Sequence, residues 1–302
     1  MTADPAIHAA AHKLFSFTRV WAIAANTFRD LVRQKVFYFM LVFALILIGA
    51  SLALASINSR GQLQTVIDVS LGAMGVFSIL LAVLATAMLL PKDIEDRTLY
   101  TILAKPVARF EYLAGKLLGV VGILALAIVL MAGVFCIVLW YWRGREIAAI
   151  PFYYDPAEAA QRIELVRSGT FTPSLFGGVF VVLLRSIVCA ALTLMISCFA
   201  TSWLFTVIVS FAAVIIGHLV AIARNVWQNP ASFGVDPPWY MDGFLRLVTV
   251  AFPDMQIFNI VDEIALGTNV APAIFATIAG LSAGYIAVYL LVGYVFFIWR
   301  EL

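Results

Sequence analysis

The charged side chains of this 302-residue chain are densest in one short segment, residues 91–116, between two long apolar runs. The chain has 19 basic and 17 acidic residues, and nine of them lie in this segment. They are Lys92, Asp93, Glu95, Asp96, Arg97, Lys105, Arg109, Glu111 and Lys116. Carboxylates and cationic groups at this density pair with one another or with a second protein. The chemistry that we expect here is recognition and not catalysis.

A short helix is expected within residues 91–116. Leu99 and Leu103 recur at helical spacing, and Pro106 ends the helix. We expect this helix to lie along the membrane face and to dock on another protein, with the two leucines as an apolar anchor. Asp93 and Glu95 either contact basic groups of that protein or pair with arginines of this chain. The alternative is a solvated hairpin that only links two spans.

Two further ionisable residues, Arg185 and His218, lie inside apolar runs. A lipid-facing Arg at this depth costs at least about 2.5–3.5 kcal/mol, so we expect Arg185 to face protein. It then lines a path or pairs with Asp254 or Glu263, or else it bonds to backbone carbonyls. For His218, packing or a hydrogen bond is expected in preference to a reaction.

No catalytic set accompanies these residues. An intramembrane enzyme needs an HExxH motif, paired aspartates at mid-depth or a Ser with a base, and none is present. The chain also lacks the GxxxxGK[ST] phosphate loop of an ATPase. We therefore expect no catalytic residue, no metal site and no cofactor bound by this chain. Its basic residues form short clusters instead of a stripe, so nucleic-acid binding is not indicated.

The elements that position these residues follow from composition. Hydrophobic residues make up 64% of the chain and charged residues 12%, which indicates an integral membrane protein. Six apolar runs reach the length of about 20 residues that a transmembrane helix needs. They are 36–57, 69–90, 117–142, 175–199, 203–223 and 271–299. We predict an all-α polytopic protein, with a single transmembrane domain over residues 1–302, because barrel strands would be shorter and would alternate in polarity.

The distribution of Lys and Arg predicts the orientation of the spans. Eleven of these residues fall on the side of both termini and of the 91–116 loop, and seven fall on the other side, over longer loops. The positive-inside rule then places both termini in the cytoplasm. No cleavable signal peptide is visible, so the first span is expected to stay in the membrane.

Several segments lie outside the spans. Residues 14–35 have one apolar arc opposite Arg29 and Arg33, which predicts an amphipathic helix at the membrane interface or, alternatively, a helix packed on the bundle. In the outer loop 143–174, Asp155 and Pro156 are a cap and first residue for a helix to Arg167. In the outer loop 224–270, residues 244–252 and 257–266 are too short to cross and predict a short extracytoplasmic or re-entrant helical hairpin before the last span.

Small residues predict one close helix contact. Gly280 and Gly284 form a GxxxG face in the sixth span. We expect this face to pack within the subunit in preference to forming a dimer.

The whole pattern resembles the permease subunits of the second type of ATP-binding-cassette (ABC) exporter. Their loop motif is an acidic pair, Thr-Leu, a Pro-Val-x-Arg turn and a Gly-Lys pair. The matching residues here are Asp93, Glu95, Thr98, Leu99, Pro106, Val107, Arg109, Gly115 and Lys116. Arg97 replaces the usual Gly. The EDRT form is similar to the branch that includes the permease of nitrous oxide reductase maturation.

The resemblance implies an exporter of a bacterial cytoplasmic (inner) membrane whose energy comes from a partner. Separate ABC ATPase subunits, two in number, would carry ATP and Mg²⁺ and dock on the 91–116 loop, and the amphipathic helix would flank them. A second permease copy or a paralogue would complete the transport path. The alternative function is a membrane anchor or scaffold of a multi-subunit complex without a path of its own.

Overall fold

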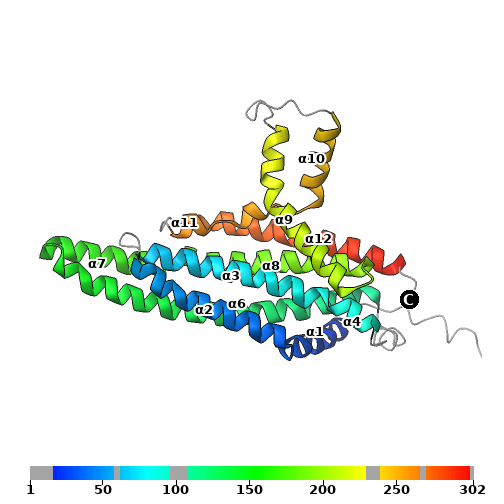
Figure 1. The fold of residues 1–302 in the computed structure, drawn as a ribbon, viewed down its shortest axis with the longest axis horizontal. Coiled ribbons are helices and arrows are strands. Elements are labelled where there is room, and N and C mark those ends of the chain that lie inside the picture. The colour runs from blue at the N-terminus through cyan, green and yellow to red at the C-terminus, as the bar shows by residue number, and fades with distance from the viewer. Residues whose placement is uncertain (1–15, 58–61, 96–107, 229–238, 266–269, 300–302) are drawn as a thin grey trace, which may run out of the picture.

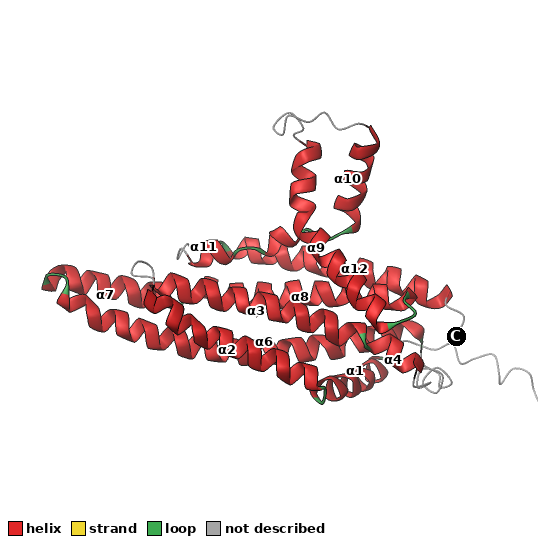
Figure 2. Cartoon of the chain, in the orientation of Figure 1, coloured by secondary structure: helices red, strands yellow, loops and turns green. Residues whose placement is uncertain are grey.

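The structure is a computed structural model, and it describes residues 16–57, 62–95, 108–228, 239–265 and 270–299. All regular structure in these ranges is helical, with short connections (Figure 2). Six helices are long and apolar enough to cross a membrane, so the prediction of an all-α protein with six candidate spans is confirmed. They are α2 (Lys35–Ile57), α3 (Gln62–Ala87), α6 (Arg109–Ala149), α8 (Pro173–Phe199), α9 (Trp203–Gln228) and α12 (Pro272–Trp299).

Helices α3 and α8 form the centre of the bundle. Helix α3 packs against α2, α6, α8 and α9, and α8 packs against α12 as well. By contrast, α2 and α12 are buried along one side only and expose large apolar residues such as Ile46 and Leu291. Lipid tails solvate such residues at no cost, so the outer helices need only a narrow packed face. The central pair therefore carries most of the protein's internal contacts.

The longest helix, α6, reaches beyond the bilayer. Its 41 residues span about 60 Å at about 1.5 Å per residue, twice the hydrocarbon thickness of about 30 Å. After a short turn, η2 (Ile150–Phe152), the chain returns as α7 (Pro156–Thr170) alongside α6 (Figure 1). Asp155 and Pro156 occupy the expected cap and first positions, and the helix runs three residues beyond the expected Arg167. We call this end of the bundle the α7 end.

The segment before α12 differs from our expectation. Helix α10 (Trp239–Ala251) does not pair with the next short helices, η4 (Met255–Phe258) and α11 (Val261–Ala265). It packs on α9, and α10 stands away from the bundle together with the last part of α9, while the rest of α9 stays in contact with α3 and α8 (Figure 1). The reason is that α9 continues to Gln228, five residues beyond the expected end, and so offers α10 an apolar partner. Helix α11 instead packs against α3 and α8.

The N-terminal helix α1 (Phe17–Val32) packs along the beginning of α6. Its residues Val20, Ala24, Thr27 and Leu31 are buried, which matches the alternative of a helix packed on the bundle. The contact needs glycine: a Cβ atom on Gly119 of α6 would lie 2.8 Å from the carbonyl oxygen of Ala24. Because Gly119 has no side chain, the backbones of α1 and α6 can lie this close to each other.

The glycines that we expected to mediate packing do not do so. A Cβ atom on Gly280 or Gly284 would meet nothing within 4 Å, because this face of α12 is exposed. The prediction of packing within the subunit at this GxxxG pair is therefore wrong. A GxxxG pair with close contacts lies instead at the start of α6, at Gly115 and Gly119, which face α1.

Candidate functional site

Two groups of polar and charged residues in the structure are candidates for a functional site. The first, which we call the junction cluster, lies where α1, α4 (Leu89–Glu95), the start of α6 and the end of α12 meet. We call this the α4 end of the bundle. The second is a cavity beside Arg185, inside the bundle.

Helix α4 joins the central span to this cluster. It follows α3 after a single non-helical residue, Met88, and Pro91 is tolerated because it lies in the first turn, where no helical N–H bond is lost. The expected loop thus begins as a continuation of α3. Leu90 and Pro91 are buried, which fixes the short helix against the bundle.

Asp93 is the residue that α4 contributes to the cluster. Its Oδ2 atom lies 2.6 Å from the Nζ atom of Lys116 in α6, and the Tyr112 hydroxyl donates a hydrogen bond to the same oxygen. The Lys116 side chain is 8% exposed and that of Asp93 18%. A pair this sheltered is screened little by salt, and loss of one partner strands the other charge. It therefore ties α4, and with it α3, to α6.

Glu111 makes the second connection, between α1 and α6. It is fully buried and accepts hydrogen bonds from Arg19 Nη2 at 3.0 Å and from the Ser16 backbone N–H at 2.7 Å. Its other oxygen accepts from the Ala108 N–H at 3.2 Å, which caps the first turn of α6. Each carboxylate oxygen has a donor, so the buried charge is satisfied.

Arg109 makes the third connection, to the last turn of α12. Its Nη1 atom donates to the carbonyl oxygens of Phe297 and Ile298, both at 2.9 Å. These carbonyls belong to the helix end, where no further backbone N–H is available, and a cation there also favours the helix dipole. The Phe297 ring is in turn stacked on Tyr112, with centroids 5.8 Å apart.

The cluster overlaps only partly with the residues that the sequence indicated. Asp93 and Arg109 belong to it, while Glu95 ends α4. The expected docking residues Arg97, Thr98, Leu99, Leu103 and Pro106 lie outside the described residues. Sequence reasoning counted Glu111 and Lys116 among the loop charges but missed their roles. The sequence did contain a signal for both roles. Glu111 lies three residues after Ala108, the N-cap of α6, and Lys116 follows Gly115, which packs against α1.

Arg185 lies on α8 and faces α3 and α9 inside the bundle. Its Nη2 atom contacts Nε2 of His218, whose Nδ1 atom lies 2.8 Å from the Val214 carbonyl oxygen. A carbonyl only accepts, so Nδ1 carries the proton and the neutral ring accepts from the guanidinium through Nε2. The Nε atom of Arg185 has no hydrogen-bond partner in the described part of the chain. The Arg185 guanidinium thus donates to the uncharged His218 ring.

A cavity of about 410 Å³ adjoins this pair. Asp68, Arg185, His218 and Asn259 are its main polar lining residues, among apolar side chains of α3 and α8. Asp254, an expected partner of Arg185, pairs instead with Arg224 at 3.0 Å and caps η4 through the Gln256 N–H. Asp254, which is 2% exposed, is therefore paired with Arg224 and not with Arg185.

Cysteine and metal chemistry find no support among the described residues. Cys136, Cys189 and Cys198 are free thiols. No group of three or more His, Cys, Asp or Glu side chains within the described ranges is placed to hold a metal ion.

The sequence matches no protein-family model, and no curated protein matches it significantly. Function is therefore inferred from the fold, from these two sites and from the loop pattern.

Proposed function

We propose that this chain is the transmembrane permease subunit of an ATP-driven ABC exporter of the second type. One observation carries the proposal: the two described ends of the segment that would receive an ATPase, α4 and the start of α6, are tied to each other and to α3, α1 and α12. Helix α4 is almost continuous with α3, and the Asp93–Lys116 pair fixes it to α6. The loop motif of residues 93–116 supports the same function.

The mechanism follows from this connection. A separate ATPase docks on the 91–116 loop, with Leu99 and Leu103 as the apolar anchor and Glu95 and Arg97 at its rim. Closure of the ATPase on ATP and Mg²⁺ then moves α4. Because α4 pulls on α3 directly and on α6 through Lys116, and α6 in turn holds α1 through Glu111 and α12 through Arg109, these helices move together. A flexible linker would absorb this motion instead.

Topology and partners complete the proposal. Both termini and the junction cluster face the cytoplasm, and the exposed Trp21 of α1 lies in the headgroup region. A second permease copy or paralogue packs against this chain, and the Arg185 cavity lies beside the path between them. The exposed apolar faces of α2, α9 and α12 offer surface for such a subunit.

Cross-linking in cells tests the docking site while the partner is still unidentified. A photoreactive amino acid at position 99 is expected to capture a protein with a phosphate-binding loop, identified by mass spectrometry. The matched control is position 165, an exposed Leu on α7 at the opposite end of the bundle. Capture of an ATPase from position 99 alone supports the proposal. A folded protein that captures no ATPase from position 99 contradicts it and favours a scaffold.

Once that ATPase is known, one substitution measures how strongly its binding depends on Leu99. Leu99→Asp should abolish copurification of the ATPase and its stimulated hydrolysis in nanodiscs, while Leu165→Asp leaves both intact. Buried apolar anchors dominate most interfaces, whereas single exposed charges contribute about 0–1 kcal/mol. Retention of both properties in folded Leu99→Asp protein shows that the loop is only a linker.

A further inference from the structure

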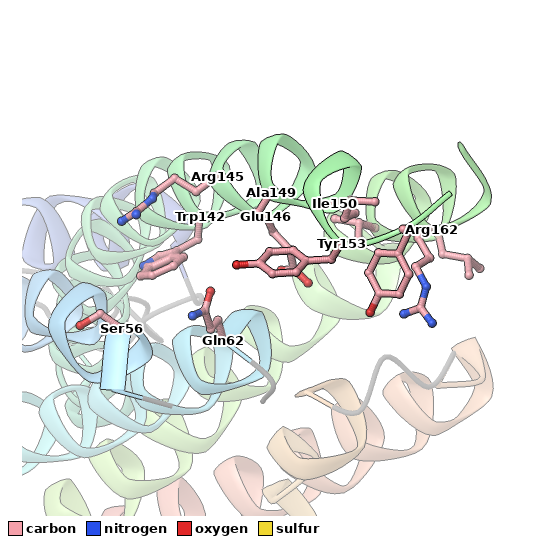
Figure 3. Close-up of a pocket in the computed structure, with 12 residues that line it drawn as sticks. Ser56, Gln62, Trp142, Arg145, Glu146, Ala149, Ile150, Tyr153 and Arg162 are labelled. Atoms are coloured by element: carbon pink, nitrogen blue, oxygen red, sulfur yellow. The ribbon is translucent and has the colours of Figure 1, made fainter. Parts of the chain in front are cut away.

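The α7 end contains a cavity of about 670 Å³ that the proposed export mechanism does not use. It lies between the outer ends of α2 and α3 and the hairpin of α6 and α7. Figure 3 shows Trp142, Gln62 and Tyr153 around a common space, with Glu146 on the same side of α6 as Trp142. The lining combines three aromatic rings, from Trp142, Tyr153 and Tyr154, with polar and charged groups.

The cavity lies at the depth of lipid headgroups. Trp142 ends the apolar run of α6, Ser56 lies in the last turn of α2, and Gln62 is the first residue of α3. Trp and Tyr side chains concentrate at this level of a membrane, because the ring is apolar and its N–H or O–H group is polar. Below it, Leu47 and Leu54 of α2 expose their side chains toward the bilayer.

The charges of the lining do not all cancel within the protein. Arg162 pairs with Glu158 at 3.1 Å and lies 4.0 Å from the centroid of the Tyr154 ring, so its charge is matched. No ion pair within the described part of the chain engages Arg145 or Glu146. The guanidinium of Arg145 lies 5.3 Å from the Trp142 ring centroid and is exposed to solvent. One cation and one anion therefore remain available on adjacent residues.

Two buried polar atoms in the same lining have no hydrogen-bond partner among the described residues. They are the Nε1 atom of Trp142, a side chain that is 4% exposed, and the Oε2 atom of Glu146. A buried donor and a buried acceptor left without partners cost free energy, and such groups are satisfied by ordered water or by a bound ligand. The cavity thus presents a hydrogen-bond donor from Trp142, a cation from Arg145 and an anionic acceptor from Glu146.

We propose that this cavity binds the headgroup of a zwitterionic phospholipid of the outer leaflet, of the phosphoethanolamine type. The phosphate accepts hydrogen bonds from Arg145 and from the Trp142 N–H. The ammonium group pairs with Glu146 and lies against the aromatic rings, which attract cations. An anionic headgroup would leave Glu146 without a cation. The acyl chains follow the exposed apolar face of α2 below the cavity.

The lipid site is independent of the proposed export function. It lies at the opposite end of the bundle and is tested on the purified chain without an ATPase. A failure here leaves the docking experiment untouched, and a failure of that experiment leaves the lipid site untouched.

The test uses the full-length protein in detergent, supplied with equal amounts of phosphatidylethanolamine, phosphatidylglycerol and diacylglycerol of identical acyl chains. Retained lipid is quantified by mass spectrometry after gel filtration, and the melting temperature is recorded with each lipid. We expect selective retention of phosphatidylethanolamine and the largest rise in melting temperature with that lipid. Glu146→Gln should lower its retention about fivefold and remove its advantage over phosphatidylglycerol.

The controls separate the headgroup site from general lipid binding. Glu164→Gln changes an exposed carboxylate of α7 outside the cavity and should leave selectivity unchanged. Arg145→Gln removes an exposed cation without creating an internal cavity, so it serves if Glu146→Gln lowers the folded yield; it should reduce retention of both phospholipids. Equal retention of all three lipids overturns the proposal. So does stabilisation by soluble phosphoethanolamine that equals that by the lipid, because the ligand would then be a water-soluble zwitterion.

Discussion

The two ends of the bundle treat their charged residues in opposite ways. At the α4 end, Asp93, Arg109 and Glu111 each bind a group on a different helix. At the α7 end, Glu146 and Arg145 face an open cavity, and a Trp142 nitrogen has no partner among the described residues. Polar groups that are satisfied within the protein hold helices together, whereas polar groups left unsatisfied are available to a ligand. The difference supports the two proposals, with mechanical connection at the α4 end and lipid binding at the α7 end.

The largest expected effect comes from breaking the sheltered pair at the α4 end. Lys116→Met removes the cation beside Asp93 and leaves a carboxylate in a site that is mostly shielded from water. We expect a loss of about 3 kcal/mol in the free energy of unfolding, measured by reversible denaturation in mixed micelles. The control Lys92→Met changes an exposed cation of α4 and should cost less than about 0.5 kcal/mol.

A double-mutant cycle then isolates the pair itself. Asp93→Asn combined with Lys116→Met should cost less than the sum of the two single changes by at least about 1 kcal/mol, because the double variant leaves no unpaired charge. Additive costs would mean that the contact between α4 and α6 does not fasten the two helices. The proposed transmission from α4 would then lack its main connection.

The next effect concerns the glycines. Gly119→Val should cost about 1–3 kcal/mol and release α1, because the new Cβ atom would lie 2.6 Å from the Cβ atom of Thr27. Hydrogen exchange over residues 17–32 reports the release. Gly280→Val, at a position with nothing within 4 Å, is the matched control and should leave stability unchanged. If Gly280→Val alone weakens self-association, the exposed face of α12 is a contact between subunits.

These two glycine positions show why part of the fold could be predicted and part could not. Six spans follow from apolar length, since lipid imposes a minimum run on any helix that crosses it. The GxxxG pattern, however, occurs in both α6 and α12, and the sequence does not state which one meets a neighbour. That outcome depends on α1, whose small residues Ala24 and Thr27 face Gly119. Pairing of helices is a property of two surfaces, and one pattern describes only one of them.

The sites were predictable to a similar degree. A dense charged segment identified Asp93 and Arg109, but their partners lie on other helices, 23 and 188 residues away. The cavity at Trp142 and Glu146 was not predicted, because α6 extends past the span boundary and α7 folds back on it. Sequence length alone gave no sign of that return. The missing information was three-dimensional proximity in each case.

A smaller effect is expected inside the bundle, between the two ends. Hydrogen bonds within membrane bundles contribute about 0.6 kcal/mol on average, so His218→Ala should destabilise the protein by about that amount. Arg185→Leu should be close to neutral for stability, because it removes a guanidinium whose Nε atom has no partner in the described residues. Both are measured by denaturation in micelles. A loss of more than about 3 kcal/mol for Arg185→Leu would show that the residue is a structural tie of the bundle and not a lining of the cavity.

The smallest expected effect returns to the α7 end and separates its two arginines. Arg162 and Glu158 form an exposed i, i+4 pair on α7, with side chains 48% and 53% exposed. Such pairs contribute about 0.3–0.5 kcal/mol, because water screens the charges and both side chains lose rotamer freedom. Glu158→Gln should therefore lower stability by no more than about 0.5 kcal/mol, and raising the salt concentration should erase the difference between variant and wild type. It should leave the retention of phosphatidylethanolamine unchanged, since the freed Arg162 adds a second cation but Glu146 still provides the only unmatched anion among the described lining residues. A change in lipid selectivity with Glu158→Gln would show instead that Arg162 is the cation that binds the phosphate, and the roles of Arg145 and Arg162 in the cavity would be exchanged.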